Sequence, residues 1–257
     1  MIETRKLALE KDGRRLLSDI SISIREGEII GIIGRPGSGK TLLMNCLCAD
    51  ERNFDGEVLI DRRPVRSFGR KLLNRTISCS YHYRPGYLDD TVYDFLIMSR
   101  APYKKLFNPY GEEDRLVAEE YITQFDLDPY RHTRLHECTD DVMARVILAF
   151  SFIREAPLLI LDNPTCYMSI QSTLLLHRSI MRYVIDGTNQ CIIVSHDLNF
   201  IAQTVDRILI MDNGTVMEEV APHQLTADLI QNYFQTEVLL SRNIYNGKPS
   251  IHLYTEN

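Results

Sequence analysis

Eight consecutive residues have the types and spacing needed to hold a triphosphate. They match G-x-x-x-x-G-K-[ST] at every position, and they are Gly34, Arg35, Pro36, Gly37, Ser38, Gly39, Lys40 and Thr41. Glycines let backbone N–H groups converge on phosphate oxygens, and a helix that starts at the end of the loop adds positive potential. Lys40 would reach the β- and γ-phosphates, and Thr41 would ligate Mg²⁺. The alternative is a glycine-rich turn that binds nothing, which the full match between a strand and a helix disfavours.

A second metal ligand is predicted at Asp162. This residue follows the apolar run Leu158 to Leu161, which is typical of a buried strand. In sites that bind triphosphates through such a loop, an acid at the end of a buried strand holds Mg²⁺ directly or through water. Many strands end in aspartate, so this motif is weak alone and gains its weight from the loop that precedes it.

The elements that must position these residues alternate between strands and helices. Apolar runs or alternation predict strands at 20–24, 29–33, 56–60, 158–161, 191–194, 207–211 and 215–220. Helical spacing of apolar residues predicts helices at 42–49, from 91 to about 153, at 171–185 and at 223–235. Residues 70–90 are expected to be irregular, and the tail from residue 237 has no assignable pattern.

This order of elements predicts an α/β fold. We expect a mainly parallel sheet with a helical subdomain. The family resemblance described below implies, in addition, a P-loop NTPase core with an N-terminal antiparallel β portion. The expected divisions are an ATP-binding core at 1–84 and 155–235, a helical subdomain at 85–154 and a C-terminal extension at 236–257.

The composition is that of a globular protein, with 44 % apolar and 25 % charged residues. The formal net charge of −6 argues against nucleic acid as the main partner. No apolar run approaches the ~18 residues that a spanning helix needs, and the first residues have no apolar signal core. We therefore expect a cytoplasmic protein in which any membrane association goes through a partner. The resemblance described below implies a position peripheral to the inner face of the cell membrane.

With the loop and Asp162 in place, the sequence resembles the ATP-binding subunits of ABC transporters from about residue 3 to 235. Residues 191–198 resemble the family's switch-histidine strand, which implies that His196 contacts the γ-phosphate. A histidine at a strand end is more often structural, but its place after Asp162 favours the nucleotide role. Residues 212–216 resemble the family's closing hairpin.

A narrower resemblance lies in the predicted helical subdomain. Residues 90–94, 99–103 and 112–114 resemble the ATPases of iron-siderophore, haem and vitamin B12 importers. A generic helical subdomain is the alternative.

Several positions depart from the pattern that the resemblance implies. The family glutamate that polarises the attacking water corresponds to Asn163, whose amide cannot accept a proton as a carboxylate does. The family's signature loop, Leu-Ser-Gly-Gly-Gln, falls at 138–142, where Asp140 and Asp141 replace both glycines. Two carboxylates there would repel a nucleotide bound by the opposite subunit. The local alternative is that Thr139 or Asp140 caps the following helix.

Three more positions differ from the family. The glutamine that senses Mg²⁺ appears as His82, which joins Asn163 and His196 in the predicted catalytic set. The aspartate of the loop after the Mg²⁺ strand appears as Ser169. The aromatic residue that stacks on adenine falls near Lys11, whose stem could still lie over the base.

The resemblance implies an ATP-binding subunit that forms a homodimer or heterodimer and serves a membrane permease, with ATP and Mg²⁺ as ligands. The permease would dock on the helical subdomain and on the segment from Tyr83 to Asp90. Because of Asn163, Asp140 and Asp141, we expect ATP binding to survive and hydrolysis to be slow. One alternative is a pseudo-ATPase that acts as a structural or regulatory subunit. Another is a soluble ABC protein of cluster assembly or DNA maintenance.

Overall fold

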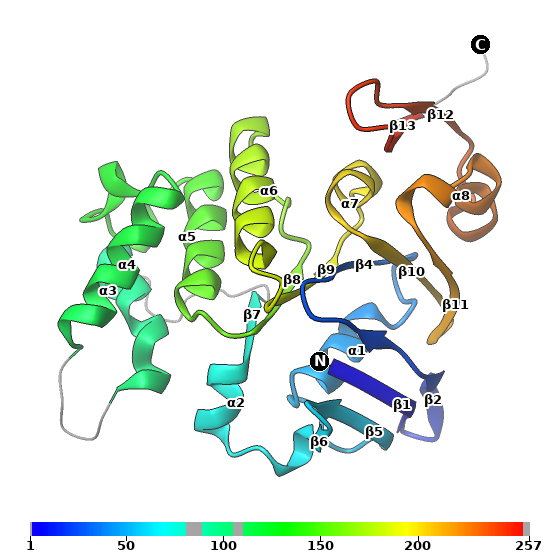
Figure 1. Ribbon diagram of the computed structural model, residues 1–257, viewed down its shortest axis with the longest axis horizontal. Helices are drawn as coiled ribbons and strands as arrows, with labels where there is room; N and C mark the ends of the chain where they lie inside the picture. The colour runs from blue at the N-terminus through cyan, green and yellow to red at the C-terminus, as the bar shows by residue number, and fades with distance from the viewer. Residues whose placement is uncertain (1, 81–88, 105–109, 254–257) are drawn as a thin grey trace. The chain divides into compact units, whose positions relative to one another are not determined.

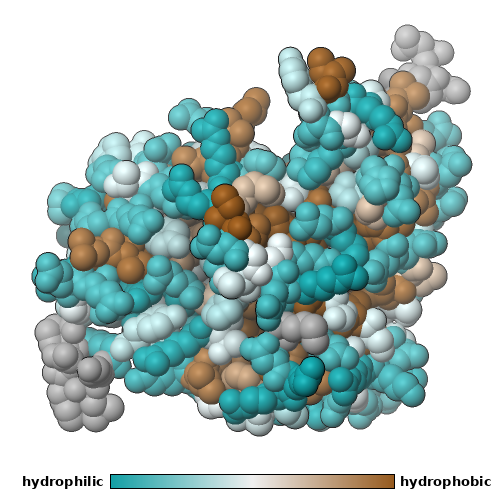
Figure 2. Space-filling view, in the orientation of Figure 1, coloured by the Kyte–Doolittle hydropathy of each residue, from teal (hydrophilic) through white to brown (hydrophobic). Residues whose placement is uncertain are grey.

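The computed structural model describes residues 2–80, 89–104 and 110–253 of the 257-residue chain (Figure 1). The chain divides into two compact units, one made of 1–68 with 190–257 and the other of 69–189. Within the described ranges, no helix is long and apolar enough to cross a membrane. Hydrophilic side chains dominate the face in Figure 2.

The first unit begins with an antiparallel sheet in the order β2-β1-β5-β6, in which β3 also pairs with β1. Its strands are β1 (Ile2–Lys11), β2 (Arg14–Ile20), β3 (Ser23–Ile24), β5 (Asp55–Ile60) and β6 (Arg63–Pro64). The prediction of a single strand at 20–24 is wrong, because residues 21 and 22 belong to neither β2 nor β3. Between the two strands, the Thr4 hydroxyl donates to the Ile20 carbonyl at 2.9 Å and accepts from the Ile22 N–H at 3.0 Å, and the Thr4 N–H donates to the Ile22 carbonyl at 2.8 Å.

The same unit contains strands in the order β11-β10-β4-β9. They are β4 (Ile29–Ile33), β9 (Gln190–Val194), β10 (Arg207–Asp212) and β11 (Thr215–Val220). Strand β4 runs parallel to β9 and β10, and all of its residues are buried, as its continuous apolar sequence predicts. The helices of this unit are α1 (Lys40–Leu47), α7 (Leu198–Thr204) and α8 (Ala227–Phe234).

The C-terminal tail, which has no assignable sequence pattern, forms a hairpin of β12 (Val238–Arg242) and β13 (Pro249–Leu253). Val238 packs with Leu225 and Ile230 in a small apolar cluster. The Asn199 side chain of α7 donates to the Ile251 carbonyl at 2.9 Å and accepts from its N–H at 2.8 Å. These contacts hold the hairpin on α7 and α8.

The second unit carries two strands and five α-helices within its described residues. They are α2 (Arg70–Thr76), β7 (Ile77–Ser80), α3 (Val92–Ile97), α4 (Glu112–Gln124), α5 (Asp140–Ile153), β8 (Leu158–Asp162) and α6 (Ile170–Val184). The expectation of irregular structure from residue 70 is wrong, because α2 and β7 lie there. Strand β7 is short and pairs with β8 in parallel, Ile77 opposite Leu158, so its partner lies too far along the sequence for a local pattern to reveal it.

Helices α3, α4 and α5 pack side by side (Figure 1). Phe152 of α5 contributes to their core, with its ring centroid 5.3 Å from that of Phe125. Phe95 of α3 stacks on Phe150 of α5 at 4.7 Å. The strands, the antiparallel N-terminal sheet and this helical cluster together confirm the predicted α/β class.

Replacing Ile230 tests whether the C-terminal cluster contributes to stability. Ile230 is 1 % exposed, so Ile230→Ala should lower the free energy of unfolding by about 2–5 kcal/mol, measured by urea denaturation. Ile244 in the hairpin loop is 87 % exposed, so Ile244→Ala should change it by no more than about 0.5 kcal/mol. Equal effects of the two changes would contradict the packing of the hairpin described above.

Candidate nucleotide-binding site

The predicted phosphate loop follows β4 and leads into α1. Lys40 is buried, and its ammonium donates to the carbonyls of Gly34 and Arg35 at 2.7 and 2.9 Å. It also donates to the Ser38 hydroxyl at 3.1 Å. These hydrogen bonds tie the start of α1 back to the loop residues that precede it. Thr41, in the first turn of α1, is exposed.

The turn between β10 and β11 supports this loop from one side. A Cβ atom added to Gly34 would lie 2.3 Å from the Met211 carbonyl oxygen, so no other residue fits at position 34 without a shift. The Gly214 N–H donates to the Ser38 carbonyl at 3.0 Å. Arg35 forms an ion pair with Asp212 at 3.4 Å. The sequence indicated this hairpin but not its contact with the loop.

The first turn of α1 fits a bound phosphate. Gly39 caps the helix in the left-handed conformation, no side chain caps it, and its first turn carries no acidic residue. The first N–H groups of a helix have no partner within the helix, and they attract an anion. A Cβ atom at Gly37 would meet nothing within 4 Å, so the loop has an open side. The donor set therefore suits a polyphosphate, and the Thr41 hydroxyl suits the Mg²⁺ that accompanies one.

His196 lies at the same edge of the parallel strands as this loop. Strands β4 and β9 run parallel with Ile32 opposite Val194, so the residues that follow each strand emerge at one edge. The Ser195 N–H donates to the Ile32 carbonyl at 3.3 Å. The His196 side chain is exposed. His196, which is predicted to contact the γ-phosphate, therefore follows the strand next to the one that leads into the loop.

Asp162 ends β8 in the second unit and is 7 % exposed. Its N–H donates to the Ser80 hydroxyl of β7 at 3.4 Å. The Asn163 side chain donates from Nδ2 to Asp162 Oδ1 at 3.1 Å, and the Asn163 backbone has a positive φ of 44°. Asparagine tolerates this conformation better than most residues, whereas a glutamate there could not donate to Asp162.

The predicted site residues therefore fall into two groups. In the first unit, Lys40 donates hydrogen bonds to its own loop. In the second unit, Asp162 accepts a hydrogen bond from Asn163. That both groups surround one triphosphate stays a prediction. His82 lies outside the described residues. Lys11 ends β1 and is exposed, and the first 53 residues of the sequence contain no aromatic side chain.

The segment that corresponds to the signature loop has a local structural role. Thr139 is the N-cap of α5, and its hydroxyl accepts from the Val142 N–H at 3.4 Å. The predicted capping role is thus confirmed for Thr139. Asp140 is exposed in the first turn of the helix, where a negative charge is favourable.

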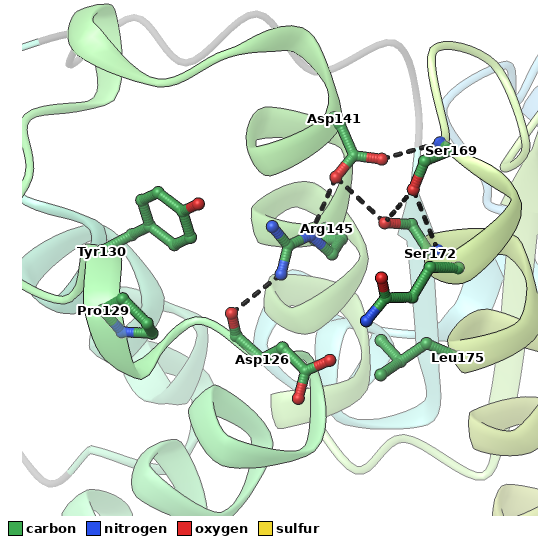
Figure 3. A pocket seen from close by; sticks show the side chains of 9 residues that line it. Asp126, Pro129, Tyr130, Asp141, Arg145, Ser169, Ser172 and Leu175 are labelled. Atoms are coloured by element: carbon green, nitrogen blue, oxygen red, sulfur yellow. Dashed lines mark hydrogen bonds and ion pairs between the residues drawn. The ribbon is translucent and has the colours of Figure 1, made fainter.

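Asp141 makes a set of contacts that sequence reasoning missed (Figure 3). Its Oδ1 accepts from the Ser169 N–H at 2.7 Å, and its Oδ2 accepts from the Ser172 hydroxyl at 3.0 Å. Arg145, one turn further along α5, places Nε 3.2 Å from Oδ2. Within the second unit, the carboxylate therefore joins the first turn of α5 to the first turn of α6.

These contacts line a pocket of about 290 Å³ together with Asp126 and Tyr130. Partial burial of Asp141 by itself raises the pKa of the carboxyl. The hydrogen bonds from Ser169 and Ser172 and the charge of Arg145 outweigh burial, so the pKa lies below the usual value for aspartate. The carboxylate is therefore charged at neutral pH.

Comparisons with known proteins agree with this architecture. The family model described as "ABC transporter" matches residues 17–166. The petrobactin import ATP-binding protein FpuC of Bacillus anthracis is 23 % identical over 239 residues, which cover 93 % of this chain and 88 % of FpuC. The iron(3+)-hydroxamate import ATP-binding protein FhuC of Bacillus subtilis (strain 168) is 22 % identical over 249 residues, covering 96 % and 93 % of the two chains.

Solved structures share the fold. A chain from an ABC transporter in an inward-facing conformation superposes with a TM-score of 0.80 at 14 % identity, covering 98 % of this chain and 95 % of that one. The dimeric structure of MJ0796, a bacterial ABC transporter cassette, gives a TM-score of 0.75 at 22 % identity, covering 86 % and 98 %. At these identities the likeness supports the fold alone.

The Asp141 contacts predict a pH-dependent contribution to stability. Asp141→Asn should lower the free energy of unfolding by about 1–2 kcal/mol at pH 7, because a charged acceptor is replaced by an amide that has one acceptor oxygen. A carboxyl whose pKa is lowered by folding stabilises above its unfolded pKa and loses that effect as pH falls through the folded value. The penalty should therefore shrink below about pH 4 in denaturant titrations.

Asp140→Asn is the matched control for this measurement. Both substitutions remove one negative charge from the first turn of α5, which is worth about 0.3–1 kcal/mol, but only Asp141 contacts α6. A penalty that is equal for the two variants, or independent of pH, would show that the contacts do not stabilise the fold.

Proposed function

Because the chain belongs to the ABC transporter family, we propose that it is an ATP-binding subunit that couples ATP binding to transport by a partner permease. The observation that carries this proposal is the phosphate loop, in which a buried lysine closes the loop ahead of a helix whose start has no side-chain cap. Lys40 binds the phosphates, Thr41 and Asp162 hold Mg²⁺, and His196 contacts the γ-phosphate. Bound Mg²⁺ neutralises charge on the phosphates.

We further propose that hydrolysis is slow. Asn163 stands where a general base is needed, and its amide is engaged with Asp162. General-base assistance is worth about 10²–10⁴ in rate, so its loss leaves binding intact and slows turnover. The Asn163–Asp162 bond also supports a second candidate, a pseudo-ATPase that binds nucleotide and acts as a structural or regulatory subunit.

The partner follows from the relatives, whose names describe import ATP-binding proteins. We propose a permease that docks on the helical subdomain and near Tyr83 to Asp90, where residues 83–88 lie outside the described ranges. The subunit acts as a homodimer or heterodimer at the inner face of the membrane, and nucleic acid is not a partner. The division into a core at 1–84 and 155–235, a subdomain at 85–154 and an extension at 236–257 belongs to the same proposal.

Lys40→Met tests nucleotide binding. The variant keeps the apolar stem and loses the charged hydrogen bonds, so the Kd for Mg-ATP should rise about 10–150-fold in calorimetry. Arg242→Met on β12 removes one positive charge from an exposed site and should leave the Kd unchanged. A wild-type chain that does not bind Mg-ATP would overturn the proposed function.

Asn163→Glu tests the hydrolysis claim. With a carboxylate restored, kcat measured by phosphate release should rise about 10²–10⁴-fold. Asn163→Gln lengthens the side chain equally without adding a base and should give no such gain. If the wild-type protein, alone or with its partner, turns over at the ordinary ~1–100 s⁻¹, slow hydrolysis is wrong.

A further inference from the structure

The loop 163–169 connects the two features of the second unit that bear on chemistry. It begins at Asn163, which donates to Asp162, and it ends at Ser169, the N-cap of α6. Inside the loop, the Cys166 N–H donates to the Asn163 carbonyl, and Tyr167 has a positive φ of 66° and is 73 % exposed. Asn163 and Ser169 are therefore the two ends of one short segment.

Asp141 holds that end from another helix. It accepts from the backbone of Ser169 and from the hydroxyl of Ser172, so both of its carboxylate oxygens face α6 (Figure 3). The Ser169 hydroxyl also donates to the Ser172 hydroxyl at 3.0 Å, which links the two serines to each other. We call the set Asp141, Arg145, Ser169 and Ser172 the latch.

The latch is anchored at its other side by Arg145. This arginine is 8 % exposed, and its Nη1 donates to the carbonyls of Phe125 and Asp126 at 3.0 and 2.8 Å. Its Nε faces Asp141. Hydrogen bonds from Arg145 to the end of α4, an ion pair between Arg145 and Asp141, and hydrogen bonds from the start of α6 to Asp141 thus connect the three helices.

An ionised aspartate suits the position that Asp141 occupies. It receives two hydrogen bonds and one guanidinium, which are all donors, whereas asparagine would turn an NH₂ group toward one of them. A glycine at position 141 would leave Arg145 and the two serines without this acceptor. The carboxylate of Asp141 is therefore directed at α6, and repulsion of a nucleotide bound by an opposite subunit stays a prediction.

We propose that Asp141 is a positioning residue, which acts through the latch on the loop 163–169 and thereby keeps the Asn163 amide on Asp162. Asp162 is the Mg²⁺ ligand of the proposed function, on which this part of the inference rests. With the latch intact, the Asp162 carboxylate is held by Asn163 in one orientation. With the latch released, the loop shifts and the affinity of the site for Mg²⁺ changes.

Hydrogen exchange of the nucleotide-free protein tests the latch without relying on the proposed function. In Asp141→Asn and in Ser172→Ala, amides of residues 163–172 should exchange about tenfold faster than in the wild type, because the local opening becomes easier. Asp140→Asn is the matched control and should leave those amides unchanged. Equal exchange in Asp141→Asn and Asp140→Asn would overturn the latch.

Magnesium titration tests the positioning role. Binding of a fluorescent ATP analogue is measured as Mg²⁺ is added. The Mg²⁺ concentration at half-maximal binding should change by at least about threefold in Asp141→Asn, whereas the affinity for the analogue in EDTA should equal that of the wild type. General destabilisation would not produce this split. Faster exchange with an unchanged Mg²⁺ requirement would overturn the positioning role. If the wild type binds no ATP, the proposed function and the positioning role are both wrong. The hydrogen-exchange experiment then tests the latch by itself.

Discussion

Three oxygens of the loop after β4 accept hydrogen bonds from the Lys40 ammonium. Two other elements of the first unit also hold this loop in place. Strand β4 is buried, which fixes the start of the loop, and the hairpin turn at Gly214 bonds the Ser38 carbonyl from the other side. A loop held in this way can present the first N–H groups of α1 to an anion without reorganising.

In the second unit, the residue type at position 163 bears on the chemistry that we propose for the site. Asn163 has a left-handed backbone conformation after β8, and its side chain donates to Asp162, the last residue of that strand. A carboxylate in its place would be a base and would also repel Asp162. The amide therefore forms an acid–amide pair with Asp162, and we propose that this pair is compatible with Mg²⁺ binding and unsuited to activating water.

The two aspartates of the signature segment have different surroundings even though they are adjacent in sequence. Successive helical residues point in directions about 100° apart, so Asp140 is exposed whereas Asp141 faces α6. Charge alone would have assigned both the same repulsive role. At the start of α6, Asp141 accepts from the backbone N–H of the N-cap Ser169 and from the hydroxyl of Ser172.

The sequence by itself determined the phosphate loop, the acid after β8, the main strands and helices and the α/β class, because each rests on a local pattern of residue types. It also indicated the hairpin at Asp212 to Gly214 and the cap at Thr139. Tertiary structure alone decided the short strand β7, the C-terminal hairpin and the partners of Asp141. The pairing of β7 with β8, the contact of the hairpin with α7 and the bonds from Ser169 and Ser172 to Asp141 join residues 28 or more positions apart. A hydrogen bond across such a separation leaves no periodic trace in the sequence.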